Sequence, residues 1–308
     1  MPIPSQLNVD IVNPETGTKV TVSGIAIDSP NTDCIAVGTD SLTSITTGLR
    51  NIAIGTEALN SVTAGNNSIA IGYNALKLYN GFPANVAIGY NSLKDLVSNV
   101  QNTAIGSQSL EKATGTGNTA VGFQSLVTQI AGTSNSALGN QSGLGLVSGN
   151  NNTFLGNQAG YLSTSGDNNI IIGYLAVAST TTSSNEITLG NSSNSVLRCA
   201  VTSITSLSDA RDKEDIAKLT AGLEFVKELN PVSFVWNDRN EDGKHGVKDF
   251  GFIAQDLKAT QEKYDMAETL GLVYDENPEK LEASYGKLIP ILVKAIQELT
   301  AKVEQLEK

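Results

Sequence analysis

The chain has 308 residues, of which 40% are apolar and 5% aromatic, and its formal net charge is -11. The length suggests about two domains. The negative charge excludes a duplex-binding protein, since phosphate binding needs clustered Lys and Arg. The 29 glycines, together with many Asn, Ser and Thr residues, favour β-structure with tight turns over a helical enzyme.

The charge is divided unevenly along the chain. Residues 1–207 contain 6 basic and 10 acidic side chains, whereas residues 208–308 contain 14 basic and 21 acidic side chains. The weakly charged part is typical of a structural array, and the charged part of an ordinary α+β domain.

The first ten residues have neither a basic segment nor an apolar core of a signal peptide, and no run approaches 18 apolar residues. We therefore expect a chain made in a cytoplasm-like compartment without membrane insertion. Cys34 and Cys199 lie at opposite ends of the array described below and are expected to be buried thiols, not a disulfide framework or a metal site.

Residues 1–32 form the first segment, in which two short alternating stretches at 8–12 and 18–22 predict β-structure. A repeat then organises residues 33–198. Glycines that end short apolar runs are separated by 17 residues in eight intervals and by 16 in one. These glycines are Gly38, Gly55, Gly72, Gly89, Gly106, Gly122, Gly139, Gly156, Gly173 and Gly190.

The positions around each repeat glycine are chemically regular. A branched aliphatic residue stands one before it and a mostly β-branched residue three before it, which predicts a short strand with these side chains buried. The small residue between them, as at Ala53 or Ala87, is expected to point away from the inner face. Asn stands four before the glycine in seven repeats, as at Asn118, where stacked amides can hydrogen-bond between coils. A second glycine ten residues after the first, as at Gly48 and Gly132, predicts another corner with positive φ.

One coil of 17 residues cannot bury a face of its own, but stacked coils form a continuous core. The sequence therefore predicts a parallel β-solenoid of ten coils, roughly 50 Å long at about 4.8 Å per coil. The pattern N-x-A-I-G-x-x-A/S-L, as in residues 51–59 and 85–93, resembles the head repeats of trimeric YadA-type adhesins. That resemblance implies a left-handed β-roll and a trimer. The 17-residue period and the Gly143 and Gly160 that replace Leu depart from the adhesin pattern.

Two other functions of such an array would need residue patterns of their own. Ice binding would need a regular Thr-x-Thr ladder, which the repeats lack. Polysaccharide hydrolysis would need a close pair of acids, and the acids of the array do not recur as such a pair, although a site between protomers stays open as an alternative. These acids include Asp40, Glu57, Asp95, Glu111, Asp167 and Glu186.

After a linker at 199–207, the charged segment 208–308 opens with a serine and a lysine five residues apart, Ser208 and Lys213. If the chain bends there, the two could form a nucleophile-base dyad. Lysine is a base only when burial or nearby cations remove its proton. On spacing alone, a solvated charged turn is the simpler interpretation.

The residues that follow are more specific. They read GLE at 222–224, LNPVSFVW at 229–236, GFIAQ at 251–255 and YGKLIPILVKAIQEL at 285–299. Together they resemble the intramolecular chaperone, self-cleaving peptidase domain at the C-termini of phage tail fibres and tail spikes. The resemblance implies trimerisation of the preceding stalk and cleavage between Leu207 and Ser208, with Ser208 as nucleophile and Lys213 as base. Asp212 and Asp215 depart from the family pattern.

Near the C-terminus, apolar residues at helical spacing predict a coiled-coil seam or a surface helix packed on its own domain. They are Leu288, Leu292, Ile296, Leu299, Val303 and Leu306. An EF-hand-like spacing from Asp238 to Asp249 is better explained as a polar hairpin turn. His245 in that turn is an alternative partner for Ser208, and Trp236 is expected in the core.

These observations lead to one expectation and two alternatives. We expect a homotrimeric tail fibre or receptor-binding appendage of a virion, assembled in the host cytoplasm, whose residues 1–32 attach to other tail or baseplate proteins. Its shaft would bind a host-surface glycan or protein, and its residues 208–308 would direct assembly and then cleave themselves off in a single turnover, with no external substrate. No cofactor, metal, nucleic acid or membrane is expected. The alternatives are a depolymerase tail spike and a cellular protein that releases a trimeric fragment.

Overall fold

The computed structural model describes residues 18–22, 25–29, 33–81, 84–98, 101–194, 196–198, 208–237, 245–266 and 270–307. The chain divides into two compact units, Met1–Asn191 and Ser192–Lys308. Within the described ranges no helix is long and apolar enough to cross a membrane.

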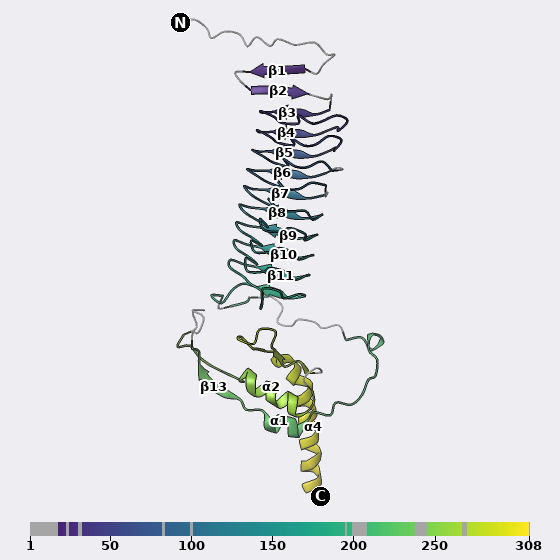
Figure 1. Ribbon diagram of the computed structural model, residues 1–308. Coiled ribbons are helices and arrows are strands. Elements are labelled where there is room, and N and C mark those ends of the chain that lie inside the picture. The colour runs from purple at the N-terminus through teal and green to yellow at the C-terminus, as the bar shows by residue number, and fades with distance from the viewer. Residues whose placement is uncertain are drawn as a thin grey trace. The chain divides into compact units, whose positions relative to one another are not determined.

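The first unit is a stack of short strands joined into one sheet (Figure 1). β1 and β2 are antiparallel, and β2 is antiparallel to β3. From β3 onward each strand pairs in parallel with the next, in a register offset by one coil. The strands are β1 Thr18–Val22, β2 Ile25–Ser29, β3 Ile35–Val37, β4 Ile52–Ile54, β5 Ile69–Ile71, β6 Val86–Ile88, β7 Thr103–Ile105, β8 Thr119–Val121, β9 Ser136–Leu138, β10 Thr153–Leu155, β11 Ile170–Ile172 and β12 Ile187–Leu189.

These ten parallel strands, β3 to β12, confirm the predicted β-solenoid. Of the two β-like stretches expected near the N-terminus, residues 18–22 form β1, while 8–12 lie outside the described residues. Residues 25–29 form β2, which the sequence did not predict.

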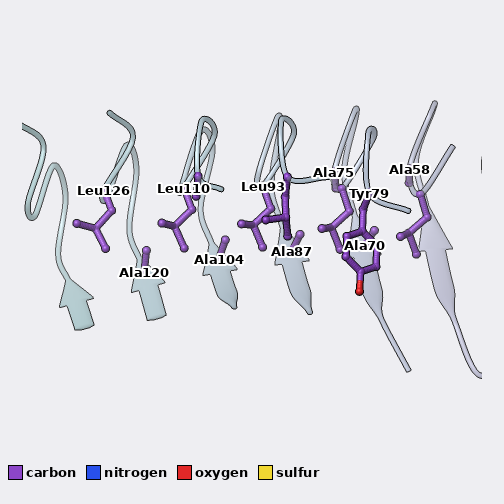
Figure 2. Packing of buried hydrophobic residues seen from close by; sticks show 14 of the residues in the cluster. Ala58, Ala70, Ala75, Tyr79, Ala87, Leu93, Ala104, Leu110, Ala120 and Leu126 are labelled. Atoms are coloured by element: carbon purple, nitrogen blue, oxygen red, sulfur yellow. The ribbon is translucent and has the colours of Figure 1, made fainter. Parts of the chain in front are cut away.

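The assignment of inner and outer strand positions was wrong. The alanine in the middle of the strands β3 to β9 is buried, as at Ala53 and Ala87, and packs beneath a column of leucines (Figure 2). The branched aliphatic residues on either side face outward, and Ile35 and Leu138 are 49% and 51% exposed. Alternation over three residues identifies two faces but not which face is buried. The interior is narrow because a leucine four residues after the glycine fills it from the opposite wall, so only a small side chain fits beneath.

The glycines are required mainly because neighbouring coils approach closely. The repeat glycines from Gly38 to Gly173 have φ between 124° and 140°, and a Cβ on Gly55 would lie 2.5 Å from the carbonyl oxygen of Gly72. At the second corner, Gly65 has no positive φ, contrary to the expectation for this column. A Cβ there would lie 2.6 Å from the carbonyl oxygen of Gly81. At Gly65 the second corner therefore needs glycine for space and not for backbone conformation, whereas Gly166 in the same column has the expected positive φ, 116°.

Buried asparagines connect the coils, as the stacking argument predicts. The side chain of Asn118 is completely buried. Its Oδ1 accepts the backbone N–H of Asn135 at 3.0 Å, and its Nδ2 donates to the carbonyl oxygen of Gly132 at 2.9 Å. The first and last coils carry other residues in this column. Cys34 donates from Sγ to the carbonyl of Gly48.

At the other end of the column Glu186 replaces Asn. Its backbone N–H still donates to Oδ1 of Asn169 at 3.0 Å. Its carboxylate accepts from the backbone N–H and Oγ of Ser179 and from Oγ1 of Thr188. In the coils that carry Asn, its side chain accepts a backbone N–H from the following coil. Because β12 is the last strand of the sheet, the Glu186 carboxylate instead accepts hydrogen bonds from its own coil.

One aromatic side chain explains where the leucine column is interrupted. Phe154 occupies the strand position that is alanine in most coils, and it is 1% exposed. Gly143 and Gly160 stand where other coils carry Leu. A Cβ on Gly143 would lie 2.8 Å from Cδ2 of the Phe154 ring, and a Cβ on Gly160 would collide with the same ring. The ring therefore fills the space that two leucines would occupy.

The second unit contains α1 Leu223–Glu228, β13 Val232–Val235, β14 Lys248–Gly251, α2 Ala254–Lys263, β15 Val273–Tyr274, β16 Glu282–Ala283, η2 Tyr285–Lys287 and α4 Leu288–Leu306. β13 pairs antiparallel with β14, and β15 with β16. Its core contains Phe225 of α1, Leu257 of α2 and Ile291 of α4, together with Leu272, which directly precedes β15. The predicted α+β part with a C-terminal helix is thereby confirmed.

The exchange between Phe154 and the leucine column gives a direct test of packing. Phe154→Ala should destabilise the shaft by about 3–5 kcal/mol, because it leaves a cavity in a tightly packed interior. Adding Gly160→Leu should restore at least half of that loss, since Leu in this column takes φ between 49° and 52° in six other coils. Denaturant unfolding followed by circular dichroism measures both. Gly160→Leu alone is the control and should destabilise, because the ring is then still present.

Candidate functional site

The charged segment begins with a short turn at residues 208–213. The 3-10 helix η1, Ala210–Asp212, is capped by Asp209, whose side chain accepts the backbone N–H of Arg211 at 2.9 Å. The guanidinium of Arg211 also donates to both carboxylate oxygens, with Nη2 2.6 Å from Oδ2. The hydrogen bond from the Arg211 side chain, reinforced by its backbone N–H, lowers the pKa of Asp209. This charge stays negative at neutral pH and holds the turn.

The turn brings the two predicted site residues together. Nζ of Lys213 lies 2.6 Å from Oγ of Ser208 and 3.4 Å from the carbonyl oxygen of the same residue. Both side chains are exposed. Leu207, the residue expected on the other side of the cleaved bond, lies outside the described residues. The bend that the serine-lysine spacing required is therefore present.

The contact has the spacing of a nucleophile-base dyad. Catalysis also needs a lysine amine that has lost a proton, because only then can it accept one from the serine hydroxyl. Contact with water favours the charged form of an amine, and burial disfavours it. Since Lys213 is exposed in a single chain, the chain alone supplies no burial that would release the proton.

The predicted alternatives for this region are placed differently. Oγ of Ser208 is bonded to Lys213, while His245 lies exposed in the turn between β13 and β14. Asp249 accepts from Nε1 of Trp236 at 3.2 Å. The other residues of the EF-hand-like spacing are outside the described residues. In the parts of the chain that the structure does describe, no three His, Cys, Asp or Glu side chains gather as a metal site.

Trp236 is not a core residue, contrary to expectation. It is 36% exposed, and it packs edge-to-face on Phe234 with ring centroids 5.3 Å apart. The two rings lie on the same side of the two-stranded sheet β13–β14, which has too few strands to enclose a tryptophan.

The predicted seam on α4 needs a correction of one position. Leu288 is 4% exposed and belongs to the core of the second unit. The exposed apolar residues start one position later and follow steps of 3, 4, 3, 4 and 3. They are Ile289, Leu292, Ile296, Leu299, Val303 and Leu306, with exposed fractions from 42% to 87%. A strict heptad seam therefore faces solvent while a different face of α4 packs on α1.

The charged residue Glu298 has a function that sequence reasoning missed. Its Oε2 accepts the backbone N–H of Leu223 at 2.8 Å and so caps α1. The preceding Gly222 makes no side-chain cap. The hydrogen bond from Leu223, followed by that from Lys294, lowers the pKa of Glu298. A missing N-cap residue before α1 was the only signal in the sequence.

With this geometry established, comparison with known families becomes informative. Residues 208–266 match the family model Peptidase_S74, described as chaperone of endosialidase. The match begins at Ser208, the residue whose hydroxyl contacts Lys213. It covers about a fifth of the chain, namely the turn, α1, β13, β14 and α2.

No curated protein and no solved structure matches the chain. The resemblance of the repeats to YadA-type heads therefore stays a prediction from the sequence. The family match supports a chaperone domain of the kind that tail fibres and tail spikes carry.

The cap on α1 predicts a pH dependence. Because the pKa of Glu298 is lowered on folding, its stabilising effect is present above the unfolded pKa and is lost as the pH falls through the folded pKa. Glu298→Ala should lower the melting temperature of the second unit at pH 7, and the difference from wild type should shrink as the pH falls through the lowered pKa of Glu298. Differential scanning calorimetry measures it. Glu304→Ala, near the end of the same helix, is the control and should show no such pH-dependent difference.

Proposed function

We propose that the chain is a homotrimeric viral tail fibre or receptor-binding appendage whose C-terminal part directs assembly and then cleaves itself off between Leu207 and Ser208. Residues 1–32 would attach to other tail or baseplate proteins, and the solenoid would form the shaft that meets the host surface. The protein would be assembled in the host cytoplasm and act in the virion. No cofactor or metal takes part in the proposed reaction.

The observation that carries this proposal is the contact at the start of the family match. The hydroxyl of Ser208 and the amine of Lys213 are 2.6 Å apart, and Ser208 is the first residue of the matched region. A released fragment that begins with Ser208 would therefore coincide with the family domain.

The reaction follows from the positions of the atoms. Oγ of Ser208 would attack the carbonyl carbon of Leu207, and Lys213, once deprotonated, would take the hydroxyl proton. The C–N bond of the peptide would break as the new C–O ester bond forms, and the proton would pass to the leaving nitrogen of Ser208. Water would then hydrolyse the ester, giving a carboxylate at Leu207 and a free amine and hydroxyl on Ser208. Attack by an adjacent residue needs no substrate pocket.

Dependence on assembly is supported by the exposure of Lys213. A second chain that covered the turn at Ala210–Asp212 would remove water from the amine and favour its neutral form. Cleavage would then report that the chains have assembled. Such control is useful for parallel, non-local β-structure, which forms slowly and exposes unpaired edges meanwhile.

Two apolar surfaces of a single chain support association with further copies. The first is the outward side of the solenoid strands, where the residue before the repeat glycine is a branched aliphatic in every coil and where Ile187 and Leu189 are 67% and 57% exposed. The second is the heptad seam of α4, on which Ile296 is 64% exposed. Rows of exposed apolar side chains are typical of interfaces.

The cleavage proposal predicts a defined fragment. Wild-type protein should yield a C-terminal fragment that begins with Ser208-Asp209, whereas Ser208→Ala and Lys213→Arg should stay full length, because the first lacks the nucleophile and the second the base. Intact mass spectrometry and N-terminal sequencing measure this. Lys218→Ala, an exposed lysine outside the contact, should cleave like wild type. An intact wild-type trimer would leave the domain as a chaperone without peptidase activity.

The assembly proposal predicts coupled loss of two properties. Ile296→Asp places a charge in the α4 seam and should abolish both the trimer and cleavage, while the adjacent exposed Gln297→Asp should change neither. Light scattering coupled to size exclusion gives the number of chains. In an isolated coiled coil, β-branched residues at Ile289, Ile296 and Val303 that alternate with leucines favour two strands. The measurement therefore discriminates, because a dimer would contradict the proposed trimer.

A further inference from the structure

An exposed aromatic pair lies beside the aliphatic columns of the shaft, one residue after the repeat glycine. Tyr73 and Tyr90 are on successive coils and stack with ring centroids 5.5 Å apart and planes inclined by 11°. They are 46% and 52% exposed. The coil before Tyr73 carries only Thr56 in this column. The face of the Tyr73 ring that does not contact Tyr90 is therefore not covered by an aromatic neighbour.

A charged pair lies on the same two coils as Thr56 and Tyr73. Nζ of Lys77 lies 2.6 Å from Oε2 of Glu57, and the two side chains are 30% and 28% exposed. The hydrogen bond to Glu57 is the largest of the effects on the pKa of Lys77 and raises it, and the Tyr73 hydroxyl is near enough to add a smaller increase. Aromatic ring, carboxylate and ammonium are thus gathered on two adjacent coils.

The next column, two residues after the repeat glycine, lacks one hydrogen-bond donor. Nδ2 of Asn74 donates to Oδ1 of Asn91 at 3.2 Å, and Nδ2 of Asn91 donates to Oε1 of Glu111 at 3.0 Å. The run begins at Glu57 on the preceding coil and ends at Glu111, and both carboxylates only accept. The run has three successive neighbour pairs, Glu57 with Asn74, Asn74 with Asn91, and Asn91 with Glu111. Each of the two amides donates one N–H to one neighbour, so one of the three pairs has no donor.

The deficit is found at the Glu57 end. Oδ1 of Asn74 has no donor among the described residues, although this side chain is only 7% exposed. Its Nδ2 points to the following coil, so Oδ1 is left on the side of Glu57. A buried acceptor without a donor costs free energy, and a side chain at position 57 that brought one N–H would remove that cost.

The neighbouring run shows that the deficit is local. On the other side of Glu111, four glutamines donate in one direction from coil to coil. Gln158 donates to Gln141, Gln141 to Gln124, Gln124 to Gln108, and Gln108 to Oε2 of Glu111, at 2.8, 3.0, 3.1 and 2.9 Å. Every contact there has its donor, because only one end is a carboxylate.

We propose that Thr56, Glu57, Tyr73 and Lys77, the Tyr73 patch, form a binding site for a neutral saccharide. The apolar C–H face of a pyranose would lie on the free face of the Tyr73 ring. One hydroxyl would donate to Glu57, and another oxygen would accept from Lys77. Glu57 and Lys77 cancel in charge, and the chain carries -11 overall, so an anionic saccharide would be repelled. This inference rests on the proposed function, for which it names a receptor chemistry and a site on the shaft.

The binding test uses full-length protein and three neutral probes, maltotetraose, cellotetraose and chitotetraose. Saturation-transfer NMR and titration calorimetry should show binding of at least one probe with a Kd on the order of 1 mM. Tyr73→Ala should weaken that binding at least about tenfold, the loss of one well-made contact. Phe123→Ala, a 45% exposed aromatic in the same column beside the complete run, should leave it within about twofold.

A second variant tests the missing donor separately. Glu57→Gln supplies an N–H to Asn74 and should raise the melting temperature by about 2–4 °C, while it weakens saccharide binding because the sugar hydroxyl loses a charged acceptor. Glu57→Ala should weaken binding without raising the melting temperature. A melting temperature that falls equally in both variants would contradict the deficit.

The outcomes separate this site from the wider proposal. Absence of binding by all three probes, or equal losses in Tyr73→Ala and Phe123→Ala, overturns the saccharide site. If the same preparation is nevertheless trimeric and cleaved before Ser208, the proposed fibre function stands. Saccharide binding by a monomeric, uncleaved chain would support the site and overturn the proposed function.

Discussion

The structure depends on one constraint, the spacing of parallel strands. Adjacent coils can hydrogen-bond only when they are about 4.8 Å apart, so each residue lies directly over its counterpart in the next coil. A Cβ on Gly55 would lie 2.5 Å from the carbonyl oxygen of Gly72. The repeat-glycine column therefore has no room for any other residue. The same spacing lets Asn118 reach the backbone of the following coil with both polar atoms. Each column is thus selected by what fits between two coils.

The exceptions obey the same constraint. Phe154 can replace alanine only because Gly143 and Gly160 replace leucine around it. The last coil exchanges Asn for Glu186, whose oxygens are satisfied within that coil. In the column that holds Asn74, a carboxylate at each end leaves one contact without a donor. Small departures from the repeat therefore mark places where packing or polar pairing changes, and the third of these marks the proposed saccharide site.

Both units leave apolar side chains exposed in a single chain, and the proposed assembly would cover them. The solenoid presents aliphatic columns to solvent, and α4 presents a heptad seam beginning at Ile289. Ser208 and Lys213 are in contact, but the amine is exposed. Association of chains would cover these surfaces and could change the environment of the amine. One event would then complete the packing and enable the chemistry, which is why we place cleavage after assembly.

The sequence by itself determined the solenoid, its ten parallel strands and the asparagine stacking, because a period of 17 residues repeats the same chemistry at each level. The spacing of Ser208 and Lys213 left a solvated turn open, and the folded turn brings the two side chains together. The sequence could not decide that Ala53 faces inward and its aliphatic neighbours outward, because three alternating residues are symmetrical between two faces. Nor could it place Leu288 in a core and Glu298 on α1, since helical periodicity does not say which face meets which neighbour. Only the tertiary structure decides these, because burial depends on what occupies the opposite wall.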